Sequence, residues 1–194
     1  MEQPSPAWSK KNSKVIAFIG ITGSGKTTQA KILGKRLGCP VISTGTVLRT
    51  RLEGDLAKEV AQGKVINDKV TIPLLEKELK KAGADKKEMV LDGSPRSLDQ
   101  AKWLISKFQS GEFMFTAFIH LRASEAVVRA RLLARGRYDD TDQSIAKRFD
   151  EYHDKVEPVL NYLKSQGYQI SEIDGEDSVE QDAEAIAEAL GVQP

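Results

Sequence analysis

A glycine-rich stretch near the amino terminus carries the residues best suited to bind phosphate. Residues 20–27 read GITGSGKT and match G-x-x-x-x-G-K-[ST], directly after the apolar run Val15–Ile19 and before a helical pattern over Thr27–Leu37. Glycines let successive backbone N–H groups converge on a polyphosphate, and the amino terminus of the helix adds positive potential. We therefore predict a nucleoside triphosphate site in which Lys26 reaches the outer phosphates and the Thr27 hydroxyl ligates Mg²⁺. The expected loop contacts are Gly23, Ser24, Gly25, Lys26, Thr27 and Thr28.

Three further segments place arginines and polar groups where strands are expected to end or where the chain is least regular. The run ISTG (42–45) closes one expected strand and precedes Arg49, while LDGSPR (91–96) closes another and precedes Gln100. In a doubly wound sheet ligands bind at the carboxyl ends of the strands, so Thr44, Asp92 and Arg96 should converge on the phosphate loop. Asp92 then has the position of a carboxylate that holds Mg²⁺ through water. Arg49 and Arg96 could form bidentate clamps on an acceptor phosphate. The third segment contains Arg131, Arg135, Arg137 and Arg148, and Arg131 and Arg135 lie four residues apart on one helix face, so both can point at the same charge.

Other polar residues favour structural interpretations. Arg122 and Arg129 are expected to be solvated or ion-paired surface residues, and His120 and His153 lie in no arrangement typical of a nucleophile or a metal ligand. The single cysteine, Cys39, is expected to be a core residue rather than a reactive thiol. Asp139 and Asp140 either form a polar turn that caps a helix or belong to the site, and both interpretations stay open.

The elements expected to position these groups alternate along the chain. Short apolar runs predict strands at Val15–Ile19, Val41–Ile42, Met89–Leu91, Phe115–Leu121 and, more weakly, Tyr168–Ile173. Helical patterns separate them, which predicts an α/β fold of the P-loop NTPase type: a doubly wound, parallel, five-stranded sheet with helices on both faces. These helices are expected at 27–37, 69–82, 98–108, 124–135, 144–164 and 179–190.

Two stretches depart from this alternation. Residues 44–73 and about 135–142 are predicted to form small inserts on a single domain of residues 14–194, and residues 1–13 to form a flexible tail. The chain has 194 residues and a net charge of +1, which gives no indication of nucleic-acid binding. Arginines concentrate between Arg122 and Arg148, and beyond Lys164 the chain is acidic. The sequence shows no apolar run long enough to span a bilayer and no leader pattern, so we expect a soluble, cytoplasmic protein.

Several motifs, in the same order along the chain, resemble those of the adenylate kinases, a group of nucleoside monophosphate kinases. GSGKTTQ (23–29) is similar to the family's phosphate loop, and STGTVLR (43–49) to its STGDLLR. LDGSPRSLDQA (91–101) resembles L-D-G-F-P-R-T-x-x-Q-A. RGRYDD (135–140), with Lys147 and Arg148 after it, resembles R-G-x-x-x-x-x-R-x-D-D and K-R-L. The resemblance extends from about Val15 to Gly175.

The resemblance implies reversible transfer of the γ-phosphoryl group of Mg·ATP to AMP, giving two ADP, by a monomer that binds only nucleotides. The cations around the transferring group would be Lys26, Arg96, Arg131, Arg135, Arg137 and Arg148, with Arg131 and Arg135 also on the ATP side. The residues that hold AMP would be Thr44, Arg49, Lys64, Val65, Ile66, Gly93, Arg96, Gln100, Arg137 and Arg148. Mg²⁺ would be held by Thr27 and, through water, by Asp92; no zinc is expected, because the Cys-rich lid of zinc-bearing members is absent.

The sequence departs from the family motifs at four places. Thr46 replaces the usual Asp of STGD, Ser94 replaces the aromatic residue of G-F-P-R, GKTT replaces GKGT, and only Gly136 separates Arg135 from Arg137. GKTT is similar to thymidylate kinases. A UMP/CMP or dTMP kinase of the same fold, or a nucleotide-binding sensor or scaffold with little turnover, therefore remain alternative interpretations.

Overall fold

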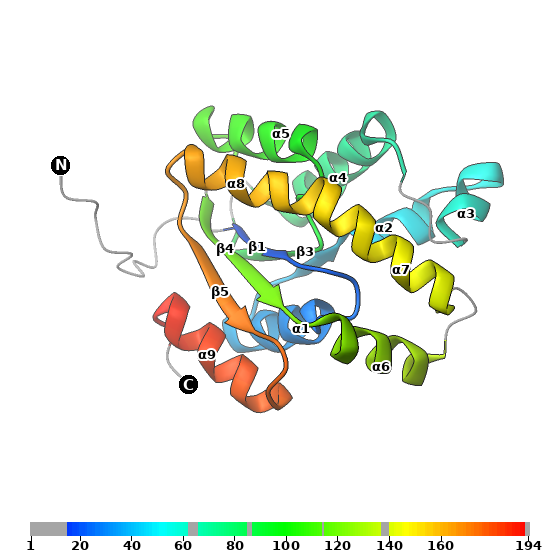
Figure 1. Cartoon of the computed structure of the whole chain (residues 1–194). Coiled ribbons are helices and arrows are strands. Elements are labelled where there is room, and N and C mark those ends of the chain that lie inside the picture. The colour runs from blue at the N-terminus through cyan, green and yellow to red at the C-terminus, as the bar shows by residue number, and fades with distance from the viewer. Residues whose placement is uncertain (1–14, 62–65, 85–86, 114, 137–139, 193–194) are drawn as a thin grey trace.

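Five parallel strands form the central sheet of the computed structural model, which describes residues 15–61, 66–84, 87–113, 115–136 and 140–192 (Figure 1). The strands are β1 (Val15–Ile19), β2 (Val41–Ser43), β3 (Met89–Asp92), β4 (Phe115–Arg122) and β5 (Ile170–Asp174), in the spatial order β2-β3-β1-β4-β5. Every neighbouring pair is parallel. The predicted doubly wound sheet is confirmed, and the weakly predicted fifth strand forms its β5 edge.

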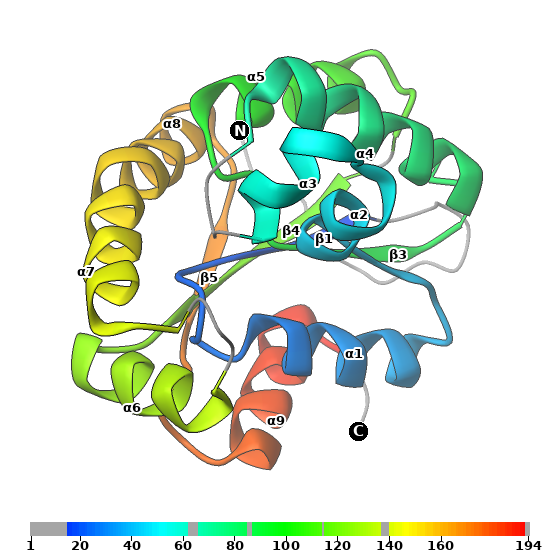
Figure 2. The same cartoon turned by 90° about the vertical axis from the view of Figure 1, so that its right-hand side faces the viewer.

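Helices cover both faces of this sheet. Helices α1 (Lys26–Leu37) and α9 (Val179–Leu190) lie on one face, and α4 (Asp68–Ala82), α5 (Leu98–Gln109) and α8 (Glu157–Ser165) on the other (Figures 1 and 2). The remaining helices are α2 (Thr44–Arg51), α3 (Gly54–Ala61), α6 (Glu125–Arg135) and α7 (Asp142–Glu151). They gather at the end of the sheet where the strands terminate. Because these four helices do not cover a face of the sheet, they can supply the walls of a site at this end.

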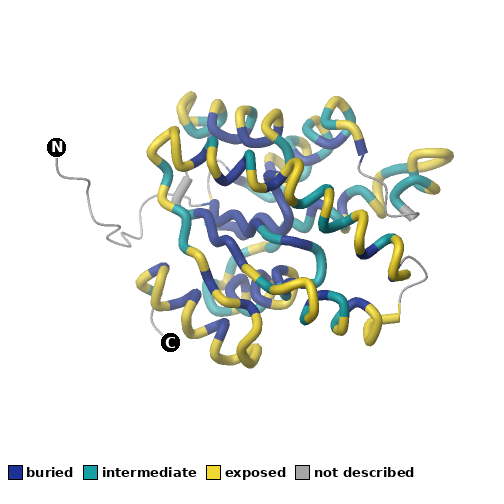
Figure 3. Tube along the Cα trace, in the orientation of Figure 1, coloured by how far each residue is buried: buried dark blue, intermediate teal, exposed yellow. Residues whose placement is uncertain are grey.

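Side chains alternate between two cores along the central strand β1. Val15, Ala17 and Ile19 pack in one apolar cluster with side chains of α4, α5 and α8, whereas Ile16 and Phe18 pack in another with those of α1 and α9. Successive strand residues point to opposite faces, so a strand covered on both sides must be apolar throughout. Figure 3 shows the result, with a buried sheet between helices that expose their outer sides.

The predicted helix over 144–164 is interrupted by one wide turn. Residues Tyr152–Val156 form a π-helical segment (η1) between α7 and α8, and Pro158 follows it in the first turn of α8. Proline lacks an N–H and crowds the preceding turn, so a regular α-helix could not continue through this position without strain. Tyr152, in the wide turn, reaches the end of β4, where its Oη lies 2.6 Å from His120 Nε2. His120 thus has the structural role expected.

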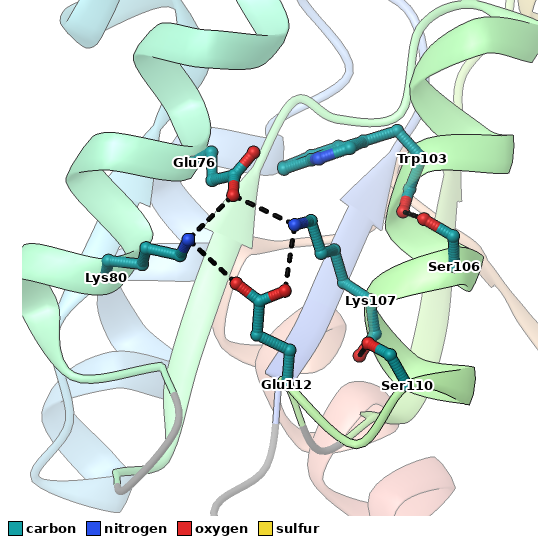
Figure 4. A network of polar contacts seen from close by, with 7 residues as sticks. All are labelled: Glu76, Lys80, Trp103, Ser106, Lys107, Ser110 and Glu112. Atoms are coloured by element: carbon teal, nitrogen blue, oxygen red, sulfur yellow. Dashed lines mark hydrogen bonds and ion pairs between the residues drawn. The ribbon is translucent and has the colours of Figure 1, made fainter.

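Four charged side chains tie α4 to α5 and to the turn after α5 (Figure 4). Lys80 Nζ lies 2.8 Å from both Glu76 and Glu112, and Lys107 Nζ lies 2.9 Å and 2.8 Å from the same two carboxylates. Each cation therefore contacts both anions.

Among the described residues, no helix is long and apolar enough to cross a membrane.

Candidate active site

One cavity of about 540 Å³ opens at the carboxyl ends of β1, β2 and β3, as expected for ligand sites in doubly wound sheets. Its walls come from the loop after β1, from α2, from the segment after β3 and from α6, α7 and α9. Cationic side chains dominate its lining. They are Lys26, Arg49, Arg96, Arg131, Arg135 and Arg148. Such a concentration of positive charge is suited to polyanionic ligands.

The loop after β1 has the backbone geometry required to enclose phosphate. Gly20 has φ +147°, and a Cβ there would lie 2.3 Å from the Leu121 carbonyl oxygen, so only glycine fits at the start of the loop. Gly25, at φ 99°, is the N-cap of α1, whose first turn has no side-chain cap and no acidic residue. The free N–H groups at this helix end are therefore available to an anion. Gly23, Gly25 and Thr28 line the cavity, whereas Ser24 is buried behind it.

Lys26 is held inside this loop. Its side chain is almost completely buried, and its Nζ donates hydrogen bonds to the Ile21 carbonyl and, at 3.4 Å, to Ser24 Oγ. Burial, helped by the nearby Arg96 and opposed by Asp92, lowers the pKa of Lys26 to about 7. An ammonium group in such surroundings gains from any anionic ligand that enters the cavity.

A hydroxyl and a carboxylate meet beside Lys26. Thr27 Oγ1 donates a 2.8 Å hydrogen bond to Asp92 Oδ2, and Asp92 is 3% exposed at the end of β3. Both residues line the cavity. Hydroxyl and carboxylate oxygens are the ligands Mg²⁺ prefers, so this pair fits the metal site that the sequence predicts.

The segment after β3 holds Arg96 in place. Arg96 Nε donates a 2.7 Å hydrogen bond to the Gly93 carbonyl, and a Cβ at Gly93 would lie 2.7 Å from the guanidinium. Gly93 also has φ +77°, so glycine is needed here for both space and conformation. Arg49, one turn into α2, lines the cavity together with Arg96. Burial lowers the pKa of Arg96, and Asp92 counteracts this effect.

Asp140 joins the arginines of α6 and α7. Arg135 donates two hydrogen bonds to its carboxylate, of 2.9 and 2.7 Å, and Arg148 donates one of 2.8 Å. The Asp140 side chain is fully buried, and the N-cap of α7 is Thr141. Of the two interpretations left open for Asp140, the structure therefore supports the one that places it in the site. On α6, Arg131 donates a 2.6 Å hydrogen bond to the Gly175 carbonyl and faces the same cavity as Arg135.

Comparisons with known proteins agree with this arrangement. The family model described as "Adenylate kinase" matches residues 18–168. The chain belongs to the adenylate kinase family. It is 35% identical over 182 residues to "Adenylate kinase 1" of Nostoc sp., covering 91% of this chain and 98% of that protein. It is 34% identical over 181 residues to "Adenylate kinase" of Corynebacterium urealyticum, covering 90% and 98%. This chain is thus a nucleoside monophosphate kinase.

The other residues expected from the adenylate kinase motifs occupy several places. Thr44 is buried between Ser43 and Gly45 in the chain, which both line the cavity. Gln100 is also buried, and its Oε1 accepts a 2.9 Å hydrogen bond from the backbone N–H of Arg96, which lines the cavity. Gly93 follows the lining residue Asp92 in the chain. Ile66 is buried at 4% exposure. Lys64, Val65, Arg137 and Asp139 lie outside the described residues.

The residues given structural interpretations behave as expected of them. Arg129 forms an ion pair of 2.7 Å with Asp142, and Arg122 pairs with Glu172 at the surface. His153 pairs with Glu157. Cys39 is half-buried beside the α1–α9 core, and burial raises the pKa of its thiol to about 11, which disfavours the reactive thiolate.

Nine lining residues of this adenylate kinase site were not predicted, and three of them lie on α1 and α9. Gln29, Val179 and Asp182 line the cavity beside Arg131. Gln29 Nε2 donates 2.9 Å to the Val179 carbonyl, while Gln29 Oε1 and Asp182 Oδ1 are buried without a hydrogen-bond partner in the described part of the chain. Burial raises the pKa of Asp182. Gln29 could have been found as the last residue of the GSGKTTQ motif, but nothing in the α9 sequence marks Val179 or Asp182.

Proposed function

We propose that this chain transfers the γ-phosphoryl group of Mg·ATP reversibly to AMP and produces two ADP, and that residues of the cavity bind both nucleotides. The observation that carries the proposal is the single cavity that brings together six cationic side chains from separate segments. Phosphoryl transfer requires in-line positioning and neutralisation of charge on the transferring group. The attacking oxygen belongs to a phosphate that is already anionic, so the reaction needs no general base.

The two substrates would approach from opposite sides of this cationic cluster. We place the ATP phosphates on Gly23 to Thr28, with Arg131 and Arg135 beside them, because this loop and these two guanidiniums line the same cavity. Arg49 and Arg96 would clamp the AMP phosphate, and Lys26, Arg135 and Arg148 would surround the group in transfer. Thr44, Gly93, Gln100 and Ile66 would form the wall behind the AMP base and ribose. The same proposal extends to Lys64, Val65 and Arg137.

The buried carboxylate Asp140 would position two of these cations. It fixes the Arg135 guanidinium through two hydrogen bonds and that of Arg148 through one, so both planes are oriented before a nucleotide arrives. Positioning groups in advance removes reorganisation from the reaction step. Asp140 itself would not touch the phosphates.

Mg²⁺ would be held by the Thr27 hydroxyl and, through water, by Asp92, since these two oxygen groups already meet at 2.8 Å in the cavity. When bound, the metal would supply positive charge that neutralises part of the charge on the phosphates. The hydrogen bond from Thr27 keeps the Asp92 carboxylate directed toward the phosphate loop.

Water competes with AMP as an acceptor, so the site should close before transfer. We propose that residues 44–73, which contain α2 and α3, close over AMP, and that the short segment 135–142 closes over ATP. Both would move on one domain of residues 14–194, with residues 1–13 as a tail. The proposed chemistry uses nucleotides alone, and we propose that the protein works as a monomer.

The decisive test measures ADP formation from ATP with AMP, UMP, CMP, dTMP or GMP as acceptor. We expect AMP to be the preferred acceptor, and Arg96→Ala to lower kcat/KM by about 10³-fold, as is typical for loss of a cation from the transition state. Arg129→Ala is the matched control, because Arg129 lies on α6 beside the site arginines but pairs with Asp142 outside the cavity.

The outcomes separate the alternatives. A preference for UMP, CMP or dTMP as the acceptor would indicate a UMP/CMP or dTMP kinase instead of an adenylate kinase. ATP binding without ADP formation from any acceptor would favour the sensor or scaffold interpretation. Near-normal turnover in Arg96→Ala would contradict the assigned roles.

A further inference from the structure

Ser94 connects two residues that the proposed function places at the AMP base. The Ser94 side chain is 1% exposed, and its Oγ lies 2.9 Å from Thr44 Oγ1 and 3.1 Å from Gln100 Oε1. Thr44 and Gln100 are also buried, at 1% and 4% exposure. One serine hydroxyl therefore links the start of α2 to α5. The adenylate kinase motif quoted above has an aromatic residue at this position, which could not make either contact.

The hydrogen bonds around Gln100 determine the direction of its amide. The Arg96 backbone N–H donates to Gln100 Oε1 at 2.9 Å, so this atom is an acceptor. Gln100 Nε2 donates to the Asp68 carboxylate at 2.7 Å. Asp68 also accepts from the Ser97 hydroxyl, which holds the carboxylate in place. The amide oxygen thus faces Ser94, and the amide nitrogen faces Asp68 and keeps a second N–H.

This orientation determines where the hydroxyl protons lie. Gln100 Oε1 can only accept, so Ser94 must donate its single proton to Gln100. Ser94 Oγ then has only lone pairs for Thr44, so the Thr44 hydroxyl must donate its proton to Ser94. As a consequence, Thr44 can offer a ligand only an acceptor, while Gln100 can offer only its remaining N–H donor.

We propose that Ser94 is a specificity-determining positioning residue, which orders this donor and acceptor so that the site selects an acceptor base with an exocyclic amine beside an unprotonated ring nitrogen. Adenine presents such a pair at N6 and N1. Hypoxanthine and guanine present the reverse, an oxygen acceptor beside a ring N–H, and would leave buried groups unpaired. This inference rests on the proposed function, because it takes Thr44 and Gln100 to face the acceptor base.

The test compares AMP with IMP as acceptor at saturating Mg·ATP, because the two bases differ only at this edge. We expect the wild-type protein to prefer AMP. In Ser94→Ala the Thr44 hydroxyl is free to rotate and donate, so the ratio of kcat/KM for AMP to that for IMP should fall by about 3- to 10-fold. Ser94→Cys replaces the hydroxyl by a somewhat larger thiol, which is a weaker donor, and should give an intermediate ratio. Ser106→Ala removes a hydroxyl from α5, the helix that carries Gln100, where Ser106 donates to the Trp103 carbonyl, and this variant should keep the wild-type ratio.

Thermal denaturation shows which variants fold. If Ser94→Ala does not fold, the comparison of AMP with IMP is made with Ser94→Cys. A ratio unchanged within twofold in the folded variants would overturn the inference, and equal losses with AMP and IMP would do the same, because both describe a merely structural serine. Absence of ADP formation from ATP and AMP in the wild-type protein is a different result. That outcome would instead reject the proposed function.

Discussion

Neutralising Lys26 tests the electrostatics of the phosphate loop directly. In the free protein burial lowers the pKa of Lys26 to about 7, so at pH 8 only about one molecule in ten carries the ammonium charge. A bound polyphosphate favours the charged form and should restore nearly full protonation. ATP binding should therefore take up about 0.9 proton at pH 8, about 0.5 at pH 7 and about 0.1 at pH 6 through this residue.

Isothermal titration calorimetry in buffers of different ionisation enthalpy measures this proton uptake. Lys26→Met keeps the length of the side chain and removes the titrating group, so subtracting its uptake from that of the wild-type protein cancels the protons contributed by ATP and buffer. The expected difference rises from pH 6 to pH 8. A difference near zero at pH 8 would refute the reasoning, because it would mean that Lys26 is already charged in the free protein.

The same residue makes a prediction about folding. Its pKa is lower in the folded state than in the unfolded chain, so between about pH 7 and pH 10 the unfolded chain binds more protons. The free energy of unfolding should therefore rise with pH across this window, by up to about 1.4 kcal/mol per pH unit from this residue. Lys26→Met should lack this contribution, and urea denaturation of both proteins from pH 7 to pH 10 would measure the difference.

Two further predictions concern the metal and the charged network of Figure 4. Asp92→Asn should raise the Mg²⁺ concentration for half-maximal rate by about 10- to 100-fold, because Thr27 loses its anionic partner and the metal loses a supporting carboxylate. An unchanged Mg²⁺ dependence of turnover would argue against this site. Glu76→Gln should lower the free energy of unfolding by about 1 kcal/mol at pH 7, measured by urea denaturation, because Glu76 contacts two lysines. Hydrogen bonds from Lys80 and Lys107 lower the pKa of Glu76 to about 2, so its stabilisation is present above pH 4.5 and should disappear as pH falls toward 2. If Glu76→Gln lost the same free energy of unfolding at pH 7 and at pH 2, the stabilisation would not come from the ionised Glu76 carboxylate.

Local patterns were sufficient to predict the strands, the phosphate loop and most of the fold. The run Val15–Ile19 predicted a strand buried on both faces, because a parallel strand covered by helices must be apolar at every position. The spacing of Gly20, Gly25 and Lys26 predicted the phosphate loop, because its conformation is set within a few residues. The rule that ligands bind at strand carboxyl ends then brought Asp92 and Arg96 to this loop, as the cavity lining bears out.

Contacts between distant segments were decided only by the tertiary structure. The sequence left two interpretations for Asp140, because its partners Arg135 and Arg148 lie on different helices and the choice depends on how α6 and α7 pack. Asp182 reaches the cavity because β5 lies beside β4, which brings α9 next to α1. Such contacts depend on strand order, and no local periodicity encodes which strands become neighbours.

Ser94, which stands where the family motif has an aromatic residue, also separates what the sequence determined from what the tertiary structure decided. The sequence by itself identified Ser94 as a departure from the family motif, since that requires only a comparison of residue types. Its partners, Thr44 and Gln100, became apparent only once β2 and β3 were paired and α5 was placed behind them. A hydroxyl proton is directed by the acceptors that surround it in space, and here those acceptors come from segments that only the folded chain brings together.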